Sequence, residues 1–214
     1  MRHFEKLAEP EDFASWKAAH PAATFKDLGR DKLFPGAQKA RWALRNSLQA
    51  EQRGLCCYCE TRIDNGNFHV EHFRPKDPDM FPMLQLVYDN LHACCRKEAH
   101  GGADEYCGHK KANDFSEQLI SPLEPDCSTH FQYDLNGGIS GMDERGIETV
   151  SMLNLDSVLL RKSRKSLIEE FEDTESESFE SEIARHLDAT ATPLGEFYTV
   201  IKHLYDSGLL RPLS

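Results

Sequence analysis

The sequence contains no apolar run that approaches the length of a membrane-spanning helix. Its first residues, MRHFEKLAEPEDF, also lack the apolar segment that a signal peptide requires. We therefore expect a cytoplasmic protein without a membrane partner. In that reducing compartment, clustered cysteines serve as metal ligands more readily than as disulfides. No internal repeat and no long linker divides the 214 residues, a length that suggests one domain or a small core with helical additions.

Net positive charge is missing as well, because the formal net charge is -11 at pH 7. This excludes a protein that coats nucleic acid by charge alone, but not an enzyme with a locally positive cleft or a helping partner. Much of the acidic charge lies in EEFEDTESESFESE, residues 169–182. Its composition favours a solvated helix face or a mobile segment, and the alternative is a surface for a basic partner.

Three regions follow one another, and together they predict an α+β protein that is mainly helical. Residues 1–53 form a helical region, and residues 54–118 are rich in Cys, His and Gly with short strand-like pieces such as NFHVEHF. Residues 119–214 begin with the turn signal Asn136-Gly137-Gly138 between strand-like arms and then continue as helices. Apolar residues at helical spacing predict the packing faces: Ala40, Trp42, Ala43, Leu44 and Leu48; Val158, Leu159, Leu160, Leu167, Ile168 and Phe171; and Phe197, Val200, Ile201 and Leu204.

The cysteines are the first functional signal, because Cys56 and Cys59 form a C-x-x-C motif in GLCCYCE. Such a knuckle points two thiolates at one zinc ion, and a second pair must complete a tetrahedral site. The candidates for that pair, from NLHACCRK and EYCGHKK, are Cys94 or Cys95, and Cys107. The alternatives are buried free thiols and a thioredoxin-like redox pair, but the strand–helix context that a redox pair needs is missing. Cys57 and Cys127 have no partner in this scheme and are expected to be buried thiols.

Histidines, a carboxylate and amides form the second signal. HVEHFRPK places Glu71 beside His72, and Asn90 follows in YDNLHACC. His109 and Asn113 are four residues apart in CGHKKAN, a spacing that puts both on one face of a helix. A carboxylate with an imidazole or amide gives a hard, open site suited to Mg²⁺ or Mn²⁺. His72 points differently from Glu71 on a strand and is placed to take a proton from water.

Other polar residues of this segment have roles that the sequence leaves open. Asn90 is expected to hold its loop and to orient His72 by hydrogen bonding. His69 shares a strand face with Glu71, so it is a candidate for a supporting, metal-binding or catalytic role. Four cations are expected to contact substrate phosphates: Arg74, Lys76, Lys110 and Lys111. The alternative for each of them is a solvated surface charge.

These elements in this order resemble an HNH endonuclease with a ββα-metal fold, over residues 54–115. The resemblance implies a structural zinc and one catalytic Mg²⁺ or Mn²⁺. The implied zinc ligands are Cys56, Cys59, Cys95 and Cys107; the implied ligands of the catalytic ion are Glu71, His109 and Asn113; and the implied catalytic residues are His72, Asn90 and His109. The sequence departs from the commoner pattern at the insert RKEAHGGADEY, which separates Cys95 from Cys107 where a compact C-x-x-C usually occurs.

A closer resemblance spans most of residues 40–165. CYCE, HVEHFRPK, NLHACC, CGHKKAN, ISPLEPDC and LNLD together resemble the PtuB-type HNH nucleases, which are paired with the ABC-type ATPase PtuA in Septu and retron-associated antiphage defence. The resemblance implies a bacterial defence effector that cleaves nucleic acid, DNA or RNA, and docks a PtuA-like ATPase through its helical C-terminal region. It also implies products with a 5'-phosphate and a 3'-hydroxyl. The alternative is a zinc-stapled subunit that binds nucleic acid or a partner and cuts nothing, although such a module has no need of the Glu71–His72 pair.

Overall fold

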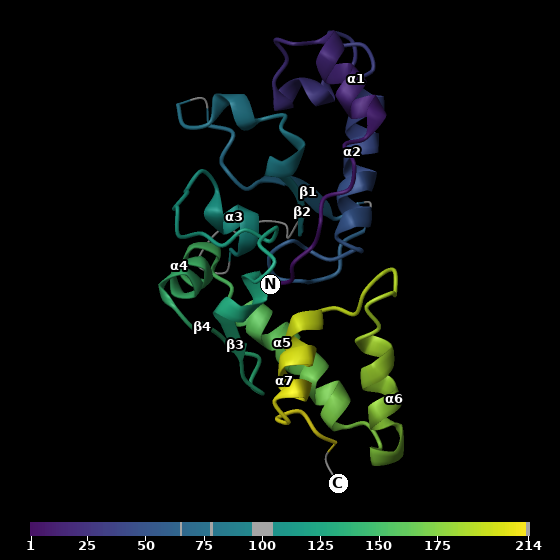
Figure 1. The fold of residues 1–214 in the computed structure, drawn as a ribbon, viewed down its shortest axis with the longest axis vertical. Helices are drawn as coiled ribbons and strands as arrows, with labels where there is room; N and C mark the ends of the chain where they lie inside the picture. The colour runs from purple at the N-terminus through teal and green to yellow at the C-terminus, as the bar shows by residue number, and fades with distance from the viewer. Residues whose placement is uncertain (65, 78, 96–104, 213–214) are drawn as a thin grey trace.

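The computed structural model describes residues 1–64, 66–77, 79–95 and 105–212. Helices and two small two-stranded sheets make up its regular structure, as the predicted α+β class requires. In Figure 1 the N-terminal helices stand at one end, the two sheets lie in the middle, and the last three helices lie at the other end. Buried residues from Met1 to Leu210 belong to one apolar cluster, so all three sequence regions contribute to a common core. None of the helices in the described ranges combines the length and apolarity that crossing a membrane requires.

The N-terminal region contains α1 (Glu11–Ala19), the short 3-10 helix η1 (Phe25–Gly29) and α2 (Ala37–Glu51). Helices α1 and α2 pack against each other, and η1 packs against α2. The buried stripe of α2 is formed by Ala40, Leu44 and Leu48. The core prediction for Trp42 is wrong, because its side chain is 69% exposed. Two positions after Ala40, at about 100° per residue, Trp42 lies on the opposite side of the helix.

Strands β1 (Phe68–His72) and β2 (Leu91–Cys95) form an antiparallel pair in which Glu71 lies opposite His92. A connection of residues 73–90 joins them and includes the 3-10 helices η2 (Pro82–Leu84) and η3 (Tyr88–Asn90). Helix α3 (Cys107–Lys111) follows and packs on β2. The chain order is therefore strand, strand, helix, and the strand predicted from NFHVEHF is confirmed.

The second hairpin consists of β3 (Phe131–Tyr133) and β4 (Ile139–Gly141) after the 3-10 helix η4 (Cys127–His130). The predicted turn lies between the two strands, as expected. Gly137 has a φ of +75°, and a Cβ there would stand 2.2 Å from the carbonyl oxygen of Arg161, so the turn needs glycine both for its conformation and for its close approach to the next helix.

The C-terminal region contains α4 (Glu144–Leu153), α5 (Val158–Glu172), α6 (Ser176–His186) and α7 (Tyr198–Asp206). Asp143 and Ser157 cap α4 and α5 by accepting a backbone N–H with their side chains. The predicted face of α7 is buried, and so are Leu160, Ile168 and Phe171 of α5. Val158 was expected in the core but is 72% exposed, because it begins the helix at its outer side. The acidic run spans the end of α5 and the start of α6, where only Phe171 and Phe179 are buried.

Candidate active site and metal centre

Cysteines from three separate segments meet at the end of the β1–β2 hairpin. Cys56 belongs to the loop after α2, Cys94 and Cys95 end β2, and Cys107 begins α3. Their Sγ atoms all lie within 4.8 Å of one another, and all four residues are buried. Cys59 joins the same group, since its Sγ lies 3.7 Å from the Sγ of Cys95.

The spacing of these sulfur atoms fits a zinc ion. Four thiolates at about 2.3 Å from one zinc, arranged tetrahedrally, are separated from each other by about 3.8 Å. The Cys56–Cys94 Sγ distance is 3.8 Å and the Cys59–Cys95 distance is 3.7 Å. Cys94 and Cys95 are both within reach, so the geometry leaves open which one completes the expected set. Cys127 lies apart, with its Sγ 3.9 Å from the carbonyl oxygen of Met1.

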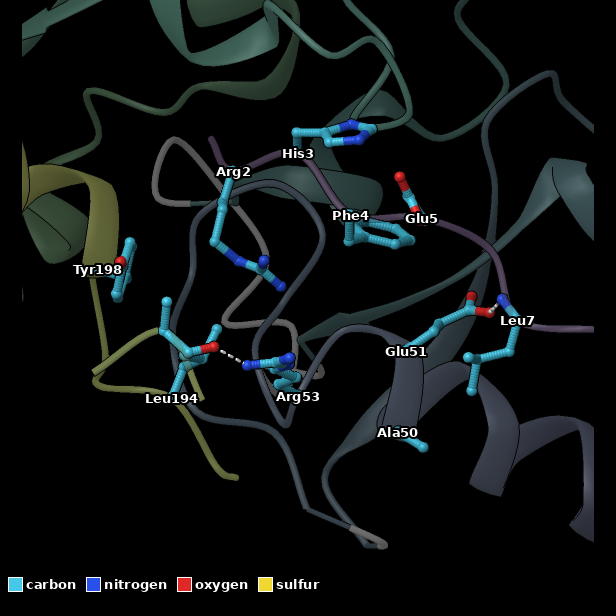
Figure 2. Close-up of a pocket in the computed structure, with 11 residues that line it drawn as sticks. Arg2, His3, Phe4, Glu5, Leu7, Ala50, Glu51, Arg53, Leu194 and Tyr198 are labelled. Atoms are coloured by element: carbon cyan, nitrogen blue, oxygen red, sulfur yellow. Dashed lines mark hydrogen bonds between the residues drawn. The ribbon is translucent and has the colours of Figure 1, made fainter. Parts of the chain in front are cut away.

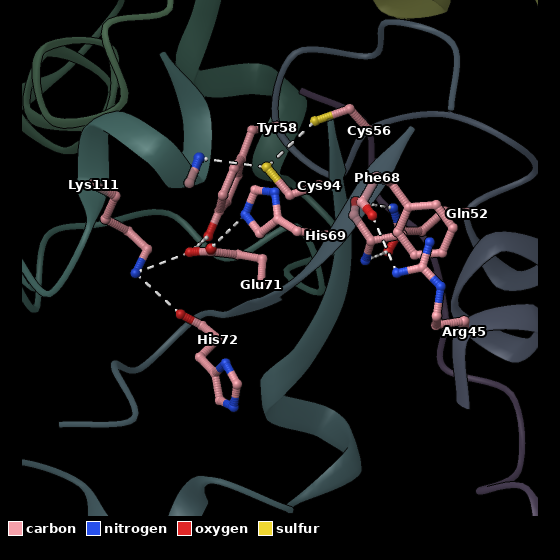
Figure 3. Close-up of polar contacts among 12 residues, drawn as sticks. Arg45, Gln52, Cys56, Tyr58, Phe68, His69, Glu71, His72, Cys94 and Lys111 are labelled. Atoms are coloured by element: carbon pink, nitrogen blue, oxygen red, sulfur yellow. Dashed lines mark hydrogen bonds and ion pairs between the residues drawn. The ribbon is translucent and has the colours of Figure 1, made fainter. Parts of the chain in front are cut away.

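A buried polar group lies next to the cysteines, between β1 and α3. The carboxylate of Glu71 is 3.3 Å from Nε2 of His69 through one oxygen and 3.0 Å from Nζ of Lys111 through the other. Lys111 also donates to the carbonyl oxygen of His72 at 3.0 Å. The rings of His69 and His109 have centroids 4.7 Å apart. Figure 3 shows Glu71 between His69 and Lys111, with Cys94 above them.

Opposing effects set the pKa of Glu71. Burial by itself raises the pKa of this carboxyl, but the hydrogen bond from His69 and the charge of Lys111 outweigh burial and hold the pKa below its usual value. Glu71 is therefore an ionised carboxylate at neutral pH, although it is almost fully buried. An ionised carboxylate beside two imidazoles is a donor set that suits a divalent ion.

Gly108 lets α3 approach this group closely. A Cβ at Gly108 would stand 2.3 Å from Oε2 of Glu71 and 2.7 Å from Nε2 of His69. Any other residue would push into the carboxylate and the imidazole. The close approach of α3 to Glu71 and His69 thus depends on the absence of a side chain at Gly108, and the carboxylate and imidazole donors present fit a bound cation.

His72 leaves β1 on the other face, and Figure 3 shows its ring directed away from the group around Glu71. Its Nε2 is 3.0 Å from the carbonyl oxygen of Gln85. A carbonyl oxygen can only accept, so Nε2 carries the proton and Nδ1 carries the lone pair. Within the described residues Nδ1 has no hydrogen-bond partner. Burial lowers the pKa of His72 to about 4, and the charges of Lys76 and Lys111 act in the same direction, so the ring is neutral at pH 7.

Comparisons with known proteins identify the family of the chain. No family model matches the chain. It is 31% identical over 177 residues to "Retron Vc95 putative HNH endonuclease" of Vibrio cholerae, a match that covers 79% of this chain and 82% of that protein. The chain belongs to the PtuB-type family of HNH endonucleases.

Two further relatives carry names of the same family. The chain is 33% identical over 107 residues to "Septu protein PtuB" of Bacillus thuringiensis, a match that covers 48% of this chain and 37% of that protein. It is 26% identical over 174 residues to "Retron Ec83 putative HNH endonuclease" of Escherichia coli, covering 71% of this chain and 66% of that protein.

In this family member Asn90 holds the loop that contacts His72. Its Oδ1 accepts from the backbone N–H of Arg74 at 2.8 Å, and its Nδ2 donates to the carbonyl oxygens of Arg74 at 2.9 Å and Leu84 at 3.1 Å. No described hydrogen bond joins Asn90 to the His72 ring. The link is indirect, because the carbonyl that fixes the ring belongs to Gln85, the residue next to Leu84.

Residues far from the motif complete the surroundings of His72. The ring of Phe25 packs edge-to-face on the His72 ring with centroids 4.5 Å apart, and Nζ of Lys76 lies 5.3 Å from the Phe25 ring centroid. A pocket of about 340 Å³ beside them is lined by Lys26, Lys76 and Gln85, among others. The sequence analysis missed Phe25 and Lys26, because no spacing signal ties η1 to a motif more than forty residues later.

Two expected site residues are placed differently from the prediction. Lys111 was expected to contact phosphates, but it is only 1% exposed and its ammonium group is held by Glu71 and the backbone of His72. Asn113 was expected to share a helix face with His109, but α3 ends at Lys111 and Ala112 has a φ of +48°. The exposed side chain of Asn113 instead donates to Oδ2 of Asp77 at 3.2 Å.

The remaining cations stay at the surface. Lys110 and Lys76 are exposed, and Arg74 is partly exposed. The Arg74 guanidinium lies 5.6 Å from the ring centroid of Phe81 and 5.5 Å from that of Phe115, so the two aromatic rings hold it in place. One Arg74 nitrogen also lies 3.9 Å from Oε2 of the exposed Glu117. All three cations lie at the surface, where a polyanion can reach them.

Proposed function

We propose that the chain is a metal-dependent nuclease that hydrolyses phosphodiester bonds with a ββα-metal site built from β1, β2 and α3. The observation that carries this proposal is the meeting of Glu71, His69 and His109 next to a neutral, uniquely protonated His72. A pure binding module has no use for a carboxylate held ionised in a buried place.

Glu71 and His109 would hold one divalent ion, with His69 as the third protein ligand in place of Asn113, which lies on a different segment from the helix. When bound, a Mg²⁺ or Mn²⁺ ion stabilises the negative charge that develops on the phosphate and on the leaving oxygen. The few ligands suit one ion better than two. Lys111 keeps the Glu71 carboxylate ionised and in position before the ion arrives.

His72 would be the general base. Its Nε2–H is anchored on the Gln85 carbonyl, which leaves the Nδ1 lone pair to take a proton from the attacking water. Phe25 packs on one side of the ring and restricts its rotation. Asn90 supports the same geometry from the other end by fixing the loop of Arg74 and Leu84.

The substrate phosphates would contact Lys26, Lys76, Arg74 and Lys110. Lys26 and Lys76 line the pocket beside His72. These local cations matter because the chain as a whole is acidic and offers a polyanion little long-range attraction. The chemistry at the site fits DNA and RNA equally, so the substrate class is nucleic acid.

The cysteine cluster would hold a structural zinc that ties the loop after α2 to β2 and α3. The bound metal would add its binding free energy to the stability of this segment. The bound zinc would fix the start of α3, and therefore Gly108 and His109, against β1.

We also propose that the protein works in an antiphage defence complex with a PtuA-like ABC-type ATPase. The support is the family: one relative is named a Septu protein, and two are named after retrons. In the division 1–53, 54–118 and 119–214, the helical third region is the proposed docking part. Co-expression with a PtuA-like ATPase from the same genome, followed by gel filtration at micromolar concentration, tests this, and separate elution would contradict it.

The decisive experiment compares cleavage by the parent and two variants on plasmid DNA and on tRNA. The parent is expected to cleave with Mg²⁺ or Mn²⁺ and to stop when EDTA is added. Removing a positioned base costs about 10²- to 10⁴-fold in rate, so His72→Ala should lose that much at saturating metal. Glu71→Ala should recover part of its activity at high metal concentration.

His20→Ala is the matched control, because His20 contacts the carbonyl oxygen of Pro35 at the surface. It should cleave as fast as the parent. A His72→Ala variant that cuts at the parental rate would overturn the assignment of the base. Nucleic-acid binding without any cleavage, with the ATPase present, would establish the binding-module alternative.

A further inference from the structure

A second cavity, of about 620 Å³, lies where the N-terminal segment, the end of α2 and the segment before α7 come together. It shares no lining residue with the pocket beside His72. Its volume is within the range of cavities that hold small ligands, roughly 300–1,000 Å³. Figure 2 shows the cavity with Arg2 and Arg53 directed toward one another and Tyr198 at one side.

The two arginines bring positive charge into this cavity, where Glu60 acts on Arg2 and Asp188 on Arg53 through their charges without contacting them as ion pairs. Among the described residues, neither Arg2 nor Arg53 forms an ion pair. The described hydrogen bond of the Arg53 guanidinium is donated to the carbonyl oxygen of Ala189. Burial lowers the pKa of Arg2 most strongly. The negative charge of Glu60 raises this pKa, and the positive charge of Arg53 lowers it by less than Glu60 raises it. Burying the Arg2 guanidinium therefore costs free energy that a bound anion would offset.

Two nearby carboxylates, Glu51 and Glu60, are already engaged elsewhere. Glu51 binds Lys6 through Oε1 and accepts from the Tyr88 hydroxyl at 2.7 Å through Oε2. Glu60 lies 3.0 Å from the amino group of Met1 and accepts from the backbone N–H of Thr199 at 2.9 Å. The carboxylate of Glu5 is exposed to solvent. Glu5 and Glu51 also line the cavity, but neither is ion-paired with Arg2 or Arg53 in the part of the chain that the structure describes, so both guanidinium groups can still receive an anion.

We propose that this cavity binds a phosphate-bearing ligand of nucleotide size, with Arg2 and Arg53 on the phosphate oxygens. The guanidinium group offers a planar fork of donors that matches phosphate geometry. Tyr198 provides a fixed aromatic wall, since its hydroxyl donates to the carbonyl oxygen of Leu187 at 3.2 Å, and a base can stack on such a ring. The ligand is a free nucleoside phosphate or a nucleotide of a nucleic-acid strand, which share this chemistry.

The site connects regions that are distant in sequence. Arg53 follows α2 and directly precedes the cysteine loop, and Tyr198 begins α7. The Arg53 guanidinium already reaches the segment before α7 through Ala189. A ligand held by Arg2, Arg53 and Tyr198 would bind these segments together at a place separate from the cleavage chemistry. The proposal therefore stands independently of the nuclease function.

Calorimetric titration of the full chain tests this with three probes: inorganic pyrophosphate, ATP without magnesium, and a short oligothymidylate. The His72→Ala background prevents cleavage of the oligonucleotide. We expect ATP or the oligonucleotide to bind, and Arg2→Gln and Arg53→Gln each to weaken binding by about tenfold or more, the loss expected for a charge-assisted contact of about 1.5–3 kcal/mol. Binding of ATP but not the oligonucleotide identifies a free nucleotide as the ligand, and the reverse identifies a strand.

Lys165→Gln is the control, because Lys165 pairs with Glu169 on the exposed side of α5. It should bind as the parent does. Arg53→Lys keeps the positive charge and should retain part of the affinity. Melting temperatures of all variants show whether any loss of binding comes from a loss of fold. Failure of all three probes to bind at millimolar concentration, or binding that neither arginine substitution changes, would overturn the proposal.

Discussion

Gly108 allows the proposed catalytic centre to be tested by one added methyl group. An alanine Cβ at this position would stand 2.3 Å from Oε2 of Glu71, whereas ordinary contact begins at 3.4 Å. The carboxylate has to move by about 1.1 Å, the difference between these two distances. It has little room to do so, because His69 holds one oxygen and Lys111 the other.

A misplacement of about 1 Å in a catalytic group can cost about 10²-fold in rate. We therefore expect Gly108→Ala to cleave about 100-fold more slowly than the parent and to need more Mn²⁺ for half-maximal activity. Alanine is favoured over glycine in a helix by about 1 kcal/mol, so the melting temperature should not fall through helix propensity. The assay is single-turnover cleavage of a labelled substrate over a series of Mn²⁺ concentrations, with zinc content measured alongside.

Gly66→Ala serves as the matched control, because its Cβ would meet Oδ1 of Asp64 at an ordinary 3.6 Å. This variant should keep the parental rate. If Gly108→Ala retains full zinc and cleaves within about threefold of the parent, the space between Gly108, Glu71 and His69 is not the place where the divalent ion acts, and the reasoning fails.

Three further predictions follow from the cysteine cluster, the buried histidines and the pocket that Lys26 and Lys76 line. Cys107→Ser should lose zinc and melt at lower temperature, whereas Cys127→Ser should keep its zinc; equal zinc in both, by elemental analysis, would contradict the ligand assignment. The folded-state pKa of His72 is lowered to about 4, so the unfolded chain binds more protons below about pH 6.5, and this group alone should lower the free energy of unfolding by about 2 kcal/mol between pH 7.5 and pH 5. Burial also lowers the pKa of His92, which adds to the fall in the free energy of unfolding at low pH. His92→Phe should therefore reduce the total fall measured by urea titrations, and an unchanged fall would refute the contribution of His92. Lys26→Ala should weaken substrate binding and reduce the salt slope by about one unit, and an unchanged slope would remove Lys26 from the phosphate path.

Local sequence patterns predicted much of the secondary structure. The periodicity of α2 and α7 gave the buried residues Leu44, Leu48, Ile201 and Leu204, because a helix must turn its apolar stripe inward. The Asn136-Gly137-Gly138 turn lies between β3 and β4, as its turn chemistry requires. Trp42 and Val158 were placed wrongly, because apolar character alone does not say which side of a helix meets the core.

In the candidate site, too, the sequence predicted some features and the tertiary structure decided others. The order of cysteines, Glu71–His72, Asn90 and His109 is a property of the sequence, and it was sufficient to predict the family. The partners of these residues are not encoded in local spacing. Whether Lys111 meets a phosphate or Glu71 depends on how α3 packs on the hairpin, and burial there demands a counter-charge.

Sequence alone therefore determined the ligand types, the strand that carries Glu71 and His72, and the helices on either side, since each depends on neighbouring residues. Only the tertiary structure decided that Phe25 and Lys26 stand beside His72, that the Gln85 carbonyl fixes its tautomer, and that Arg2 and Arg53 share a cavity. These contacts join residues far apart in the chain, and their energies depend on burial and distance, which no local pattern specifies.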